Sequence, residues 1–178
     1  MLVGESKKRY YYDTAVSALF IFYIAAMTWI ILFKFSFPEQ FYSIRINRVL
    51  NLIPFNDLII GKPMSALETI GNILIFIPFG IFISMIIGNT SVKDRVMMGM
   101  MLSIGYETIQ FIFSIGVADA TDVFTNTVGC ALGIWLYSLM RNLIRNELKI
   151  RRMVVICSAA VCVPSVAVLQ RLSTLWIR

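Results

Sequence analysis

The sequence contains no histidine and only three cysteines in 178 residues. Histidine and cysteine are the usual ligands of zinc, so few residues are left with which to build a zinc site, and we expect no metal. Cys130, Cys157 and Cys162 all lie inside apolar runs, a pattern that favours small buried side chains over disulfides. The chain also has no phosphate-binding loop and no nucleophile elbow, and we expect no cofactor.

Charged residues are few as well. They make up 15% of the chain, whereas hydrophobic residues make up 58% and the mean hydropathy is +0.79. Such a composition excludes a soluble domain of this size and predicts an integral membrane protein. The net charge of +6 does not indicate nucleic-acid binding, because the basic residues form short clusters beside apolar runs, as topology signals and lipid headgroup contacts do. We expect membrane lipids as partners and no nucleic acid.

Long apolar runs are abundant and predict an all-α fold, a polytopic integral membrane helical bundle of about five transmembrane helices. The expected spans are 14–33, 68–87, 96–115, 122–140 and a fifth within 153–178, which includes a short tail. Residues 1–13 form a basic tail, 34–67 a loop interrupted by prolines, and 141–152 a basic connector. Pro78 interrupts the second span, where we expect a bend, and Asn72 is expected to point into the bundle.

The basic residues divide unevenly between the two sides of the membrane. The tail, the turn at 88–95 and the connector 141–152 carry three, two and five lysines or arginines, which is ten of the sixteen in the chain. The positive-inside rule therefore predicts a cytoplasmic amino terminus, a cytoplasmic 141–152 connector and an external 34–67 loop.

Six polar residues lie in or between the predicted spans and form the candidate functional cluster: Asn72, Glu107, Gln110, Asp119, Asp122 and Asn126. An ionisable residue at membrane depth costs about 2.5 to 3.5 kcal/mol on insertion scales, so we expect a functional reason for its presence. Catalytic residues within this cluster are not identified by the sequence.

Helical spacing predicts how this cluster is arranged. Glu107 and Gln110 are three residues apart and share a helix face. The predicted span boundaries place Asn126 level with Gln110 and Glu107 one turn further in, near the bilayer midplane. Gly129 and Gly133 form a GxxxG step, which we expect to bring the fourth helix against Glu107. We therefore expect Gln110 and Asn126 within hydrogen-bonding reach of Glu107.

Each of these residues also has a purely structural interpretation. Asp119 and Asp122 have the spacing of a helix-capping pattern, whose carboxylates satisfy free backbone N–H groups. Asn72 and Asn126 fit hydrogen bonds between helices, and a neutral Glu107 bonded to a neighbouring amide fits simple packing. An intramembrane carboxyl nevertheless favours a functional role for Glu107.

Three motifs in order resemble the VanZ-like membrane proteins over roughly residues 15–140. They read NILIFIPFG from Asn72, YETIQF from Tyr106 and DATDVFTNTVG from Asp119, and the upstream NLIPF from Asn51 also fits. Many family members carry an arginine where this chain has Val117, and this departure argues against carrying over any mechanism that needs a cation at that position. Residues 14–140 would then form the VanZ-like membrane domain.

The resemblance implies a multi-pass protein of the bacterial cytoplasmic membrane that acts on the cell envelope. The family's namesake is associated with reduced susceptibility to the lipoglycopeptide antibiotic teicoplanin in Gram-positive bacteria. We expect binding of a lipid-linked envelope precursor or another amphiphilic ligand. Two alternatives stay open: an enzyme that acts on an envelope lipid with Glu107 or Asp122 as acid or base, and a small proton-coupled carrier.

Overall fold

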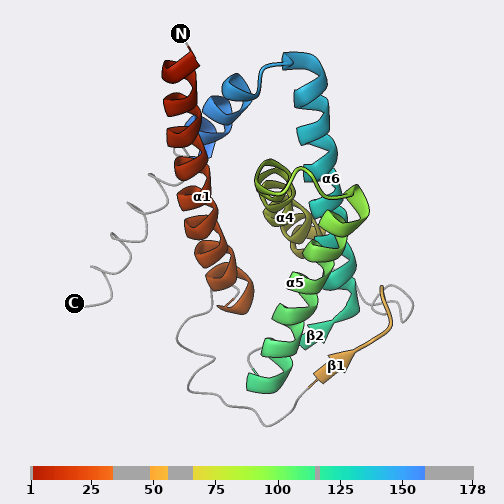
Figure 1. Ribbon diagram of the computed structural model, residues 1–178. Coiled ribbons are helices and arrows are strands. Elements are labelled where there is room, and N and C mark those ends of the chain that lie inside the picture. Colours follow the sequence, from red (N-terminus) through yellow and green to blue (C-terminus); the bar gives the residue numbers. More distant parts are fainter. Residues whose placement is uncertain (1, 34–48, 56–65, 115–116, 159–178) are drawn as a thin grey trace, which may run out of the picture. The chain divides into compact units, whose positions relative to one another are not determined.

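A computed structural model describes residues 2–33, 49–55, 66–114 and 117–158. Its long helices are α1 (Leu2–Phe33), α4 (Ala66–Ile86), α5 (Val92–Phe113) and α6 (Ala120–Ile144), shown in Figure 1. Four helices of the described chain are long and apolar enough to cross a membrane. The predicted all-α class is therefore confirmed. Residues 147–158 are also helical, and the rest of the expected fifth span lies outside the described residues.

The chain divides into two compact units, which we describe separately. One comprises residues 22–139, with the second half of α1, α4, α5 and most of α6. It contains all six residues of the candidate cluster. The other comprises residues 1–21 together with 140–178.

Glycines bring α4 and α6 into direct backbone contact in the first of these units. A Cβ at Gly129 would collide with the Ile73 carbonyl, and one at Gly133 with the Ile77 carbonyl. On the α4 side, a Cβ at Gly80 would collide with the Cys130 carbonyl. The GxxxG step therefore packs on α4, and the prediction that it brings α6 against Glu107 of α5 is wrong. α6 packs on α4 because Gly80 of α4 has no side chain and so lets the two backbones approach closely.

Two short strands complete this unit. β1 (Val49–Asn51) and β2 (Val117–Asp119) pair in parallel, with Val49 opposite Val117 and Asn51 opposite Asp119. β2 follows α5, which ends at Ser114 with a left-handed φ of 53°. Neither strand was predicted from the sequence.

β2 changes the level at which α6 begins. Glu107 lies six residues before Phe113, which is about 9 Å along α5 at 1.5 Å per residue. The three residues of β2 span about 10 Å, which is enough to run back over that length. The strand thus returns along α5, and the Asp119 backbone N–H donates to Oε2 of Glu107 at 2.8 Å. α6 starts level with Glu107, and Asn126 lies beside Ser103, at 2.9 Å. The prediction that Asn126 lies level with Gln110 is therefore wrong, because it assumed a simple turn between the helices.

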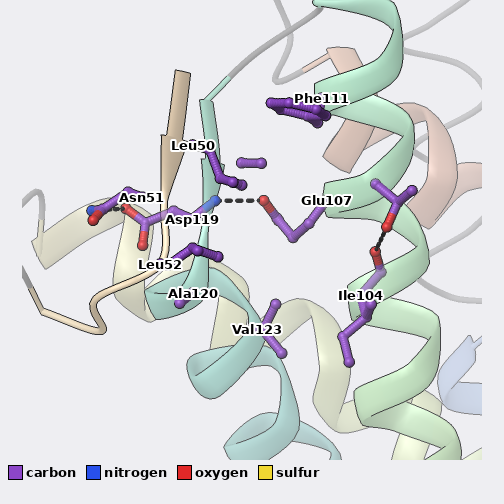
Figure 2. Close-up of a pocket in the computed structure, with 11 residues that line it drawn as sticks. Leu50, Asn51, Leu52, Ile104, Glu107, Phe111, Asp119, Ala120 and Val123 are labelled. Carbon is purple, nitrogen blue, oxygen red and sulfur yellow. Dashed lines mark hydrogen bonds between the residues drawn. The ribbon is translucent and has the colours of Figure 1, made fainter. Parts of the chain in front are cut away.

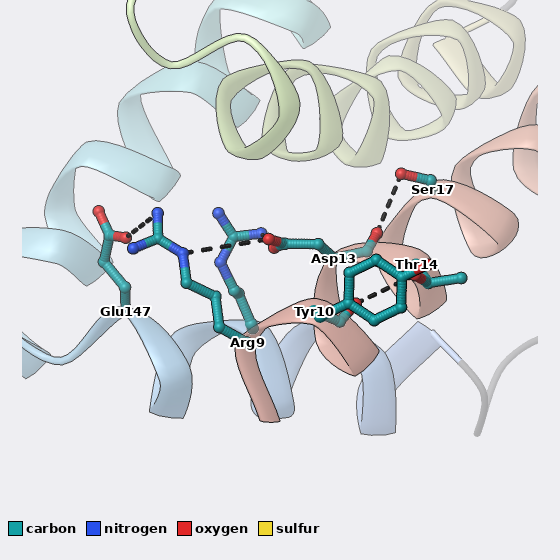
Figure 3. A network of polar contacts seen from close by, with 7 residues as sticks. Arg9, Tyr10, Asp13, Thr14, Ser17 and Glu147 are labelled. Carbon is teal, nitrogen blue, oxygen red and sulfur yellow. Dashed lines mark hydrogen bonds and ion pairs between the residues drawn. The ribbon is translucent and has the colours of Figure 1, made fainter. Parts of the chain in front are cut away.

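The other unit joins the start of α1 to the segment after α6. Asn146 caps the helix 147–158, since its Oδ1 accepts from the Lys149 N–H at 3.0 Å. Arg9 lies 4.0 Å from the Asp13 carboxylate and 3.8 Å from that of Glu147 (Figure 3), and Arg151 also pairs with Asp13. Val16 and Ile150 are each 1% exposed. Because exposed ion pairs contribute about 0 to 1 kcal/mol, these buried apolar side chains hold the unit together more than the charges do.

Candidate functional site

Glu107 is buried on α5 with 7% of its surface exposed, and it holds the start of α6. In a capping box, the third residue of a helix accepts a hydrogen bond from the N–H of its own N-cap residue. Here Glu107, from a different helix, accepts that bond from Asp119. A buried carboxylate is stabilised by such a bond and by the positive end of the helix dipole. Glu107 therefore has a structural role in addition to any chemical one.

Asp119 is the N-cap of α6 and also joins the two strands. Its Oδ1 accepts from the Thr121 N–H at 2.7 Å, which confirms the capping interpretation for this residue. Its Oδ2 accepts from the side-chain amide of Asn51 at 3.1 Å. One carboxylate thus connects β1, β2 and α6.

Asp122, the third residue of α6, contacts α4. Its Oδ1 accepts from the Asn72 amide at 2.8 Å, which confirms that Asn72 points into the bundle towards the fourth predicted span. Asp122 lies in the first turn of α6, where a carboxylate favours the helix dipole, and it also bonds to a side chain of another helix. That Pro78 bends α4 remains a prediction, although proline does lie inside the helix.

Gln110 and Asn126 do not gather around Glu107. The Gln110 amide donates to the Ile31 carbonyl of α1 at 2.9 Å, and the Asn126 amide donates to Ser103 Oγ at 2.9 Å. Their predicted hydrogen bonds to Glu107 are therefore wrong. Gln110 is 1% and Asn126 2% exposed, yet within the described structure neither side-chain oxygen has a hydrogen-bond partner. Both are buried acceptors that the protein leaves unmatched.

Asn51 and Ser103 belong to the polar interior but were missed as candidates. Ser103 lies one turn before Glu107 on the same face of α5, a spacing that could have identified it. Asn51 opens the NLIPF motif, but its place beside Asp119 depends on strand pairing across 68 residues. No local signal predicts such a pairing.

A cavity of about 340 Å³ lies between the strand pair, α5 and the start of α6. Figure 2 shows Glu107 reaching across from α5 to Asp119, with Ile104 and Val123 on one side of this hydrogen bond and Phe111 on the other. The lining is mainly apolar, and its polar members are Asn51, Glu107, Thr108 and Asp119. Among the described residues, no group of three histidine, cysteine, aspartate or glutamate side chains is placed to hold a metal.

Comparison with known proteins places this site in a family. A family model described as VanZ/LLP1 matches residues 20–141, which include every residue of the candidate cluster. Protein VanZ of Enterococcus faecium is 36% identical over 137 residues, which cover 77% of this chain and 81% of that protein. No solved structure matches. The four apolar helices of the described chain make it a membrane protein. The family model and the relative show that it belongs to the VanZ/LLP1 family.

Proposed function

We propose that this VanZ-like protein lies in the bacterial cytoplasmic membrane and binds a lipid-linked or amphiphilic envelope molecule in the cavity beside Glu107. By doing so it lowers susceptibility to glycopeptide or lipoglycopeptide antibiotics, of which teicoplanin is the one to test. The cavity itself is the observation that carries the proposal. Its volume of about 340 Å³ and its few polar groups in an apolar wall suit a small or partly inserted ligand.

The position of Glu107 supports a role in binding. Its carboxylate lies in the cavity wall and is bonded to the backbone at the junction of β2 and α6. A ligand that changes this bond also changes how α6 is capped, so binding and local structure are coupled. None of the other candidates combines cavity exposure, burial and this backbone bond.

The decisive substitution is Glu107→Gln. The amide oxygen of glutamine can still accept from the Asp119 N–H, so we expect normal insertion and abundance. If the carboxylate contributes to ligand binding, the variant returns the minimal inhibitory concentration of teicoplanin to that of a susceptible Gram-positive host without the protein. Measurement requires equal membrane abundance of variant and parent.

Two further variants serve as controls for this result. Asp94→Asn makes the same chemical change at the start of the same helix, where Asp94 is exposed and bonds to Ser91, and we expect it to keep full resistance. Asp122→Asn should be milder than Glu107→Gln, because an amide oxygen can still accept from Asn72. Parental resistance in Glu107→Gln at parental abundance would sink the functional claim for this carboxylate.

The same purified protein separates binding from the two alternatives. Turnover of added envelope lipids would identify an enzyme, and pH-driven flux in liposomes a carrier. Resistance without either activity is the outcome expected for binding.

A further inference from the structure

One exposed part of the cavity wall lies on a helix face that we expect to contact lipid. Ile104, which lines the cavity, is 45% exposed. Met101 and Met97 continue the same face of α5 and are 65% and 43% exposed. α5 has the length and hydropathy of a membrane span, so this apolar strip would face hydrocarbon. A lipid chain can therefore pass from the bilayer into the cavity over Ile104 without crossing a polar surface.

Apolar side chains line the cavity on both sides of its polar groups. Glu107 and Thr108 lie about one turn beyond Ile104, on the side of the strand pair, and Asn51 and Asp119 lie at that level. Val123 and Ile104 lie together on the other side of the Glu107–Asp119 bond (Figure 2). The side formed by Ile104 and Val123 suits the chain of an amphiphile whose polar group lies beside Glu107 and Asp119.

We propose that the hydrocarbon chain of a membrane amphiphile enters this cavity sideways from the bilayer and packs between Ile104 of α5 and Val123 of α6. This inference rests on the proposed function and specifies which part of the ligand the protein holds and by what route it arrives. An empty apolar space forfeits dispersion contacts with its walls, and the lipid beside Ile104 supplies hydrocarbon chains at high concentration. The polar groups at the strand level then select which amphiphile stays.

The test uses the full chain in vesicles of phosphatidylglycerol and phosphatidylethanolamine. A trace of phospholipid carries a photoreactive diazirine near the end of one acyl chain, and mass spectrometry locates the adducts after irradiation. We expect adducts on the half-buried Val123 at least as abundant as those on Ile112, which is 54% exposed and does not line the cavity.

Ile104→Trp should remove these adducts, because it fills the α5 side of the chain site at a position exposed enough to accept a larger side chain. We expect adducts on Val123 to fall about tenfold, while adducts on Ile112 stay constant. Ile112→Trp is the matched control and should leave Val123 labelling unchanged.

Labelling confined to exposed residues such as Ile112 would overturn the proposal. So would unchanged Val123 labelling in Ile104→Trp at parental abundance. The result is separable from the proposed function. Cavity labelling with no resistance phenotype would support chain binding and refute the antibiotic role, whereas resistance that depends on Glu107 without cavity labelling would do the reverse.

Discussion

At the scale of single residues, Asn72 and Asn126 differ in the group to which each is bonded. Asn72 donates to a carboxylate, that of Asp122, whereas Asn126 donates to a serine hydroxyl and buries an unmatched oxygen. Hydrogen bonds to charged groups contribute about 1.5 to 3 kcal/mol, and neutral ones inside membranes contribute about 0.6 kcal/mol on average. Removal of the two side chains should therefore lower the free energy of unfolding by different amounts.

The same substitution at both positions tests this difference. Asn72→Leu should lower the free energy of unfolding by about 1.5 to 3 kcal/mol, because it takes a donor from Asp122. Asn126→Leu should lower it by less than about 1 kcal/mol, because the lost bond is offset by removal of the unmatched oxygen. Unfolding by denaturing detergent, followed by circular dichroism, measures both. A larger loss for Asn126→Leu would show that its oxygen has a partner, such as a buried water.

At the scale of secondary-structure elements, the contact between α4 and α6 depends on bare backbone. Gly129→Ala places a methyl group against the Ile73 carbonyl, and overpacking of this kind costs about 1 to 3 kcal/mol. Gly105→Ala is the matched control, since its Cβ would meet nothing within 4 Å and alanine favours a helix. We expect the first variant to lose thermal stability in detergent and the second to keep or gain it. Equal melting temperatures would contradict the close packing of α4 on α6.

The strand pair depends on the side chain of Asp119. Asp119→Ala removes the cap of α6, at a cost of about 0.5 to 2 kcal/mol, together with the bond to Asn51. Asp119→Asn keeps an oxygen for the Thr121 N–H, and its amide nitrogen can donate to the Asn51 oxygen once the Asn51 amide turns over, so this variant should be close to the parent. Protease cleavage within residues 49–55 should therefore become faster in the alanine variant and stay at the parent's rate in the asparagine variant. If both variants are cleaved at the same rate as the parent, the carboxylate does not hold β1.

The strands also show where reasoning from the sequence reached its limit. The apolar runs predicted the helices, and the cost of an exposed amide in lipid predicted that Asn72 points into the bundle, since both follow from local composition. The three-residue strands β1 and β2 carry no periodic signal, and their pairing joins segments 68 residues apart. The error in the level of Asn126 follows directly, because residues 116–121 were expected to form a simple turn, whereas β2 runs back along α5 before α6 begins. The partner of the GxxxG step was equally undetermined, since a bare helix face fits any neighbour with a glycine of its own.

At the scale of the whole molecule, the distribution of charge predicts how the protein is oriented. Ten of the sixteen lysines and arginines fall in the amino tail, the turn at 88–95 and the segment 141–152. Arg145 and Lys149 are exposed in that last segment, so they are accessible to a labelling reagent or to lipid phosphates. Basic residues beside a membrane span are retained on the cytoplasmic side, where anionic lipids also attract them.

Single cysteines test this orientation, and with it the side on which the cavity's polar end lies. In a background without Cys130, Cys157 and Cys162, Lys149→Cys should resist a membrane-impermeant maleimide in intact cells and react after permeabilisation. Leu52→Cys, at a position 72% exposed just after β1, should react in intact cells if the strand pair lies on the external side. Asn89→Cys, in the exposed turn between α4 and α5, should behave like Lys149→Cys, because an odd number of spans separates it from Leu52. The reverse pattern would place the polar groups around Glu107 towards the cytoplasm, where an externally supplied antibiotic could not be their ligand without first crossing the membrane.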